Sequence, residues 1–205
     1  MIRKVSFFLA VLMLFAALCG CAPKEETWTE IQEVPSSSMY VNFPFKQAVA
    51  QAEVIVFGTV EGRQESIVTE LQVDKDFVAK SYRRKTVMNV IECLKGEAKR
   101  SYVFKDKGGI EDGVLYIYRD FLPTEVGSTV LLFLFKDGHI MGPNSRMVLN
   151  ENNTFDVYFQ MLPQNDDFSA YSGYSEYVRT DAETYLEMIR QEVAAQEQTP
   201  LQTAP

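Results

Sequence analysis

The sequence predicts a mainly β chain, folded as a barrel or a sandwich, with a short helix before the strands and a helix near the C-terminus. Short runs rich in β-branched and aromatic residues recur over residues 54–159 and are separated by turn residues about every ten positions. Apolar residues take a helical spacing only on either side of that region. A chain of 205 residues can hold one domain with a sizeable core plus terminal segments.

The N-terminal residues are typical of an export signal. Arg3 and Lys4 precede a nearly continuous apolar run, which closes on Leu18-Cys19-Gly20-Cys21. This tetrad resembles the lipobox of bacterial lipoproteins, in which the last cysteine is acylated and becomes the new N-terminus. The resemblance implies a signal peptide over residues 1–20 and lipid (palmitate) attachment at Cys21. We therefore expect a bacterial cell-surface protein, anchored by lipid on the extracytoplasmic side of the cell membrane.

A retained transmembrane helix and a plain secretory signal are the alternatives. The apolar run of about 17 residues is at the short limit for a membrane span, and Cys19 is unusual within a lipobox. Stable anchoring by lipid requires more than one acyl chain, which a diacylated cysteine supplies. Residues 21–38 are polar, with two prolines and three consecutive serines, which predicts a flexible tether after the lipidated cysteine.

The elements of the domain follow in chain order. Pro44 is suited to the first turn of a short helix over residues 45–52. Residues 54–60 are apolar on both faces, which is typical of a central strand. The later runs predict strands at 66–73, 86–94, 102–104, 114–118, 129–135, 139–141, 146–149 and 155–159.

The C-terminal region predicts a loop, a helix and a tail. Residues 161–179 form a Tyr- and Ser-rich loop, and residues 198–205 a disordered tail. Thr180 and Glu183 have the spacing of a capping box, so we expect the helix over residues 180–197. One face of this helix is apolar, with Ala182, Tyr185, Leu186, Ile189 and Val193.

Three stretches occur in an order that resembles a known family: Ala-Glu-Val-Ile-Val-Phe-Gly-Thr-Val at 52–60, Val-Ile-Glu-Cys-Leu-Lys-Gly at 90–96, and the run at 121–134 that contains Val-Gly-Ser-Thr-Val-Leu-Leu-Phe. The order resembles the netrin-like, OB-type barrel of the tissue inhibitors of metalloproteinases and of related bacterial cell-surface proteins. The resemblance implies an OB-like β-barrel, which we place at residues 39–160.

The inhibitory device of that family does not carry over to this chain. In the inhibitors, the free amine and carbonyl of the N-terminal cysteine bind the protease metal, and disulfides hold that segment on the barrel. Here we expect Cys21 to be acylated and separated from the domain by the tether. The resemblance therefore indicates a fold far more than a function.

Composition and the candidate reactive residues argue against several functions. The formal net charge of −8 disfavours nucleic-acid binding, which needs a positive face. We expect Cys93 to be a small buried hydrophobe and His139, the only histidine, to be an exposed turn residue. One histidine excludes a multi-histidine zinc site. We expect no catalytic set, metal or cofactor, although a hydrolase using Cys93 or His139 is the alternative.

Two polar stretches have both a functional and a structural interpretation. Asn150, Asn152, Thr154 and Asp156 have the oxygen spacing of a calcium loop, but Phe155 replaces the required glycine, so a hairpin turn is favoured. The second stretch contains three tyrosines among small residues. It is either a ligand-binding surface or a structural loop whose rings pack on the barrel. The candidate ligand-binding residues are Tyr171, Tyr174 and Tyr177.

These observations predict a non-enzymatic extracytoplasmic lipoprotein that acts as an interaction module. Its partners are the membrane, through the lipid anchor, and an envelope protein or a glycan. The alternative function is an envelope protease inhibitor of the metalloproteinase-inhibitor type.

Overall fold

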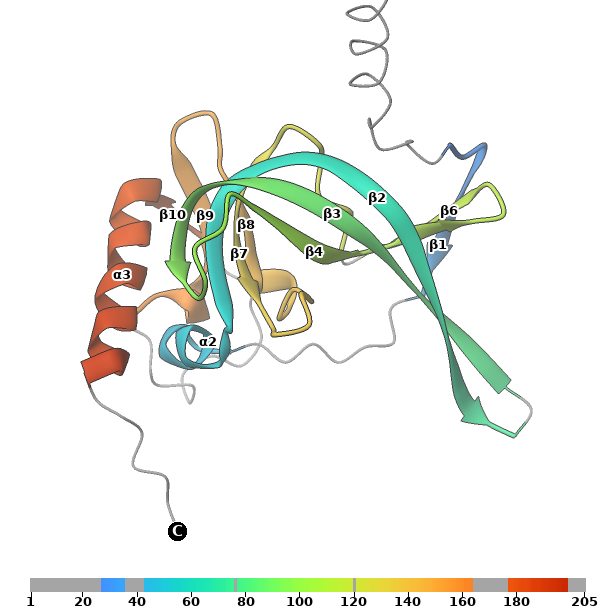
Figure 1. The fold of residues 1–205 in the computed structure, drawn as a ribbon, viewed down its shortest axis with the longest axis horizontal. Helices are drawn as coiled ribbons and strands as arrows, with labels where there is room; N and C mark the ends of the chain where they lie inside the picture. Colours follow the sequence, from blue (N-terminus) through green and yellow to red (C-terminus); the bar gives the residue numbers. More distant parts are fainter. Residues whose placement is uncertain (1–26, 36–42, 76, 120, 164–176, 199–205) are drawn as a thin grey trace, which may run out of the picture.

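The computed structural model describes residues 27–35, 43–75, 77–119, 121–163 and 177–198. The predicted class is confirmed: the fold is mainly β, with a short helix before the main sheet and a C-terminal helix (Figure 1). Cys21, Tyr171, Tyr174 and the expected tail lie outside the described residues, so the predictions made for them stay predictions. The elements are β1 (Glu30–Val34), α2 (Phe45–Gln51), β2 (Val54–Asp74), β3 (Phe77–Lys95), β4 (Ser101–Lys107), β5 (Gly109–Glu111), β6 (Val114–Tyr118), β7 (Thr129–Leu134), β8 (Arg146–Val148), β9 (Thr154–Tyr158), β10 (Tyr177–Asp181) and α3 (Ala182–Gln198), with single 3-10 turns at Pro143–Ser145 and Phe159–Met161.

The main sheet is antiparallel, has the order β4-β3-β2-β7-β8 and is strongly curled. Isolated bridges join Leu134 of β7 to Ile140 and Lys105 of β4 to His139. The Lys105 N–H donates to the Gly138 carbonyl at 2.8 Å. The segment after β7 thus touches both β7 and β4 through single bridges. The described strands form no closed barrel, so the OB-like barrel stays a prediction, and the described residues show a curled sheet.

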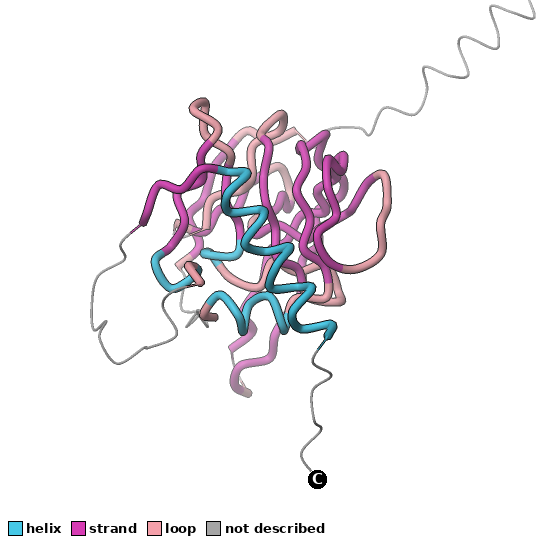
Figure 2. The backbone as a smooth tube through the Cα atoms, turned by 90° about the vertical axis from the view of Figure 1, so that its left-hand side faces the viewer, coloured by secondary structure: helices cyan, strands magenta, loops and turns pink. Residues whose placement is uncertain are grey.

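The core lies on both sides of this sheet, as the two-sided apolar pattern of residues 54–60 predicts. Alternate residues of β2, such as Val56 and Val60, face the concave side together with Met88, Phe104 and Leu132. The residues between them pack on the opposite side, against α2, α3 and β9. Figure 2 shows the two helices side by side against the strands. Burial on two faces accounts for the unbroken apolar runs of β2 and β7.

The apolar face predicted for α3 is buried as expected, but the cap is a different residue. The Thr184 N–H and the Thr184 hydroxyl each donate to Asp181 Oδ1 at 2.9 Å. These two hydrogen bonds lower the pKa of Asp181. Thr180 instead belongs to β10 and donates its hydroxyl to the Val178 carbonyl at 3.3 Å. The capping box expected at Thr180 and Glu183 is therefore wrong by one position, because β10 continues up to Asp181.

Two further boundaries are corrected. Residues 30–34, expected to be part of the 21–38 tether, form β1 and pair in parallel with β6. Residues 177–179, expected to end the 161–179 loop, begin β10, which pairs antiparallel with β9. Neither segment has a strong β pattern of its own. Each is a strand because it pairs with the edge of another strand, β6 for the first segment and β9 for the second.

Tyr185 gives a prediction on pH dependence. The ring is fully buried, and its hydroxyl donates to the Met161 carbonyl at 2.8 Å. Burial raises the pKa of Tyr185 above its ordinary value. Above about pH 10 the unfolded chain releases the tyrosine proton, whereas the folded chain keeps it. The free energy of unfolding is therefore unaffected by this group below about pH 10 and decreases as the pH rises further. We expect urea unfolding to show this alkaline loss.

Tyr185→Phe isolates the contribution of the hydroxyl. We expect it to lower the free energy of unfolding by about 1 kcal/mol at pH 7, and to flatten the loss of stability above pH 10. Tyr177→Phe is the matched control, since Tyr177 is 58% exposed. An equally steep alkaline loss in Tyr185→Phe and the unmodified protein would contradict the assignment.

Candidate functional site

A two-stranded arm projects from the curled sheet (Figure 1). The pairing of β7 with β2 covers Val54 to Thr59, and the pairing of β4 with β3 stops at Arg83. Beyond these points β2 and β3 continue only as a pair, and we call residues 66–74 and 77–82 the arm. An isolated two-stranded ribbon is marginally stable in water, so the arm requires support from elsewhere in the chain.

That support comes from the small sheet β1-β6-β5. The rings of Tyr82 and Tyr116 stack with centroids 3.9 Å apart and planes 4° apart. The Tyr82 hydroxyl donates to Glu111 at 3.1 Å, and the Lys80 ammonium donates to the same carboxylate at 2.7 Å. The Tyr82 N–H donates to the Tyr118 hydroxyl at 3.0 Å. These contacts hold the base of the arm against the small sheet.

The same contacts shift the protonation of the groups involved. Burial, followed by the hydrogen bond to Glu111, raises the pKa of Tyr82. The hydrogen bond to Glu111 raises the pKa of Lys80, and the hydrogen bond from Lys80 lowers the pKa of Glu111. The ion pair therefore stays charged, and Tyr82 stays protonated, across the neutral range.

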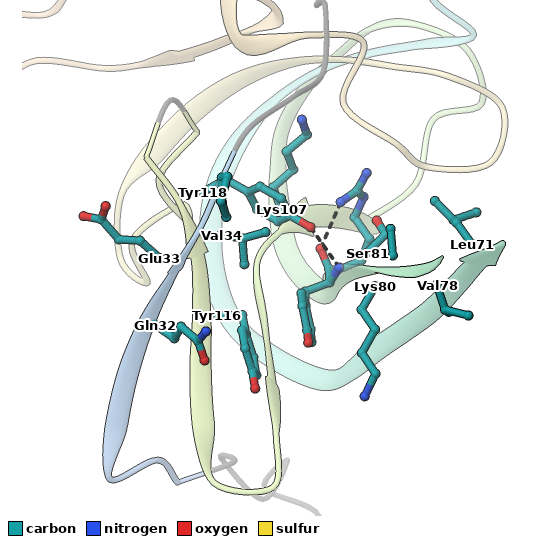
Figure 3. Close-up of a pocket in the computed structure, with 14 residues that line it drawn as sticks. Gln32, Glu33, Val34, Leu71, Val78, Lys80, Ser81, Lys107, Tyr116 and Tyr118 are labelled. Atoms are coloured by element: carbon teal, nitrogen blue, oxygen red, sulfur yellow. Dashed lines mark hydrogen bonds between the residues drawn. The ribbon is translucent and has the colours of Figure 1, made fainter. Parts of the chain in front are cut away.

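A groove of about 600 Å³ lies between the arm and the small sheet (Figure 3). Leu71 and Val78 line it on the arm, and both side chains are exposed. Val34 of β1 and Tyr118 of β6 line it on the small sheet. The groove is thus apolar and aromatic along most of its length, with one wall formed by the outer edge of β3.

The end of the groove nearest the curled sheet is positively charged. The Arg83 guanidinium lies 6.0 Å from the centroid of the Tyr118 ring, and the Lys107 ammonium lies 5.5 Å from it. Glu33, an acidic residue of the lining, is bound by Arg119 at 2.6 Å. A chain with a net charge of −8 therefore presents a cationic, aromatic pocket at this end.

A buried polar cluster fixes that charged end. Asp106 is 1% exposed and accepts hydrogen bonds from the Thr124 N–H at 2.5 Å, the Lys107 N–H at 3.0 Å and Arg146 Nη1 at 3.3 Å. Arg146 also donates to the Thr124 hydroxyl at 2.9 Å and lies 4.4 Å from the Phe121 ring centroid. The cluster ties the end of β4 to the 121–124 segment and so positions Lys107.

The reactive residues considered from sequence are not brought together. Cys93 is partly buried against the concave core, and its thiol lies 3.4 Å from the Lys95 carbonyl. The imidazole of His139 lies 3.3 Å from Asp137 in the turn after β7, and burial lowers the pKa of His139. Among the described residues, no hydrogen bond joins Cys93 to His139.

The other sequence-derived candidates lie away from the groove. Tyr177 starts β10, where its ring packs at 62° and 5.7 Å against Tyr158. In Figure 1, β10 lies near α3, on the other side of the molecule from the arm. The Asn150–Asn153 stretch forms the expected tight turn, in which the Asn150 N–H donates to the Thr154 carbonyl at 2.8 Å. Within the described ranges, no three His, Cys, Asp or Glu side chains are placed to hold a metal ion.

No protein-family model, curated protein or solved structure matches this chain. Among the helices of the described residues, none has the length and apolar character needed to cross a membrane.

Proposed function

We propose that this protein is a lipid-anchored, extracytoplasmic lipoprotein whose folded domain is a non-catalytic binding module, with the groove beneath the arm as its contact surface. The observation that carries this proposal is the groove itself, whose lining combines exposed apolar residues, stacked tyrosines and two cations. Exposed apolar surface bordered by charged residues is typical of interaction sites on soluble domains.

The polar groups around the groove favour recognition over chemistry. Lys80, Tyr82 and Glu111 bond to one another and so hold the wall of the groove. Arg83 donates to the Tyr82 carbonyl at 2.9 Å, which fixes the guanidinium beside the Tyr118 ring. Side chains engaged in this way present a fixed shape and a fixed charge to a partner.

The anchor is proposed from the Leu18–Cys21 motif and is tested separately. We expect cells that express the full chain to incorporate a clickable palmitate analogue into it, and Cys21→Ser to abolish the label. Cys93→Ser is the matched control and should leave the label unchanged. Equal labelling of the Cys21→Ser chain and the unmodified chain would contradict the anchor.

Site-specific photo-cross-linking in cells tests the binding surface. A photoreactive phenylalanine analogue is placed at Val78 of the full chain, inside the groove, or at Ile91, which is 61% exposed on the same strand. We expect a discrete cross-linked partner from position 78 and none from position 91. Capture only at position 91, or at neither position, would contradict the groove as the contact surface.

A further inference from the structure

We propose that the groove takes an extended acidic peptide segment, which adds to the outer edge of β3 as an extra strand. This inference rests on the proposed function and names the chemistry of the partner. The edge, the apolar side chains and the cations each contribute one part of the argument.

The outer edge of β3 has no strand partner among the described residues over positions 78–81 of the arm. The Tyr82 carbonyl accepts the Gly108 N–H at 3.2 Å, and its N–H donates to the Tyr118 hydroxyl, so both backbone groups of Tyr82 point away from β2. Backbone groups in a strand repeat their direction every second residue. The backbone N–H and C=O groups of Lys80 and Val78 therefore also point away from β2, into the groove. The register between β2 and β3 has no shift over this stretch, so the alternation holds from Tyr82 to Val78.

An open edge of this kind is a template for another strand. No described strand pairs with β3 beyond Arg83 on its outer side. Natural proteins usually protect such edges with charges, bulges or a covering element. Here Val78 of the edge strand itself is 46% exposed, and Leu71, opposite Ala79 on the neighbouring β2, is 52% exposed. Strand addition by an extended peptide would satisfy the backbone groups and cover Val78.

The charge of the groove selects the side chains of the peptide. A strand laid along β3 reaches Arg83 and Lys107 at the end of the groove where the β3–β4 pairing begins. Both cations lie against the Tyr118 ring, in a partly buried position that strengthens a hydrogen bond to a carboxylate. We therefore assign a Glu or Asp of the ligand to this end and apolar residues to the outer part.

Peptide binding to the full-length, lipidated protein in detergent micelles tests the inference. The probe is a fluorescent seven-residue peptide of alternating Val and Glu, and fluorescence polarisation reports its affinity. We expect the alternating Val–Lys peptide to bind at least about tenfold more weakly. The double variant Arg83→Gln/Lys107→Gln should remove most of that preference.

Backbone methylation tests strand addition directly. Two versions of the acidic peptide carry N-methyl groups on one or the other set of alternate amides, so each blocks one edge of the peptide strand. We expect one version to bind like the parent and the other to lose binding, because only one edge faces β3. Equal behaviour of the two versions would overturn strand addition.

Variants at Lys80 provide the protein-side control. Lys80→Pro removes an N–H that points away from β2, a position where an edge strand tolerates proline. Lys80→Gln loses the same ion pair with Glu111 but keeps the N–H. We expect Lys80→Pro to weaken binding of the acidic peptide at least about tenfold relative to Lys80→Gln. Equal affinities would overturn the inference.

Two other outcomes separate this inference from the proposed function. If cross-linking at Val78 captures a glycan or a folded surface while the peptide does not bind, the groove remains the contact surface and the peptide assignment is wrong. If position 78 captures only a second copy of this chain, and Lys80→Pro abolishes that dimer, the edge serves self-association and the inference is overturned.

Discussion

Replacing Asp106 with alanine is expected to lower the free energy of unfolding by about 3–5 kcal/mol. The substitution removes the acceptor for three donors in a site where Asp106 is 1% exposed and the Arg146 side chain is 15% exposed. The Arg146 charge would stay buried without its carboxylate, and the buried Thr124 N–H would lose its partner. Urea unfolding monitored by circular dichroism measures the change.

Two further variants separate charge from burial at this cluster. Asp106→Asn keeps an oxygen that can accept from Thr124, so we expect a smaller loss than for alanine. Asp156→Ala breaks an exposed ion pair with Arg179 (3.0 Å) and should cost about 0–1 kcal/mol. If Asp106→Ala and Asp156→Ala had equal effects, the buried cluster would have no special structural role.

Gly58→Ala is the second large effect we expect, with a loss on the order of 3 kcal/mol from overpacking. A Cβ built on Gly58 would lie 2.2 Å from the Asn89 carbonyl oxygen and 2.8 Å from Met88 Cε. Met88 could move its terminal methyl group, but the Asn89 oxygen belongs to the backbone of β3. The register between β2 and β3 shifts beside Gly58, where the sheet needs this close approach.

Gly62→Ala is the matched control for Gly58→Ala. Gly62 lies in the same strand, and a Cβ there would meet nothing within 4 Å. We expect its free energy of unfolding to stay within about 0.5 kcal/mol of the unmodified protein. Thermal and urea unfolding of the two variants compare the sites, and equal losses would show that the close approach to Asn89 does not decide the effect.

The parts of the fold that could be predicted are those in which the spacing of apolar residues shows which faces are buried. Residues 54–60 and 129–135 are apolar on both faces because they lie between two layers of core, and this pattern gave the right strands. The spacing of Tyr185 and Ile189 likewise predicted the buried face of α3. In each case a local periodicity reports directly on the surroundings of the element.

The arm and β1 could not be predicted because their pairing is not local. The sequence suggested separate strands at 66–73 and 86–94, whereas β2 and β3 run without a break through polar residues on both sides of them. An exposed ribbon has no buried face, so its side chains show no regular alternation. β1 pairs with β6 across more than 80 residues of chain, and the sequence EIQEV does not reveal that partner.

The candidate groove was missed for the same reason. Tyr82, Tyr116 and Tyr118 lie in separate segments, and only the pairing of distant strands stacks the first on the second. The sequence instead drew attention to Tyr171, Tyr174 and Tyr177 because they are close together in the chain. The signal available was the alternation of Tyr116 and Tyr118, which places both rings on one face of β6.

Residue-resolved hydrogen exchange of the full-length protein, alone and with the acidic peptide, tests the central claim most directly. The free protein should exchange the amides of Val78 and Lys80 rapidly, because they face the open groove. With the peptide bound, we predict at least about tenfold slower exchange at these two amides, since a strand hydrogen bond must open first. Protection confined to Tyr177–Asp181, with Val78 and Lys80 unchanged, would contradict the claim that the groove is where this protein binds its partner.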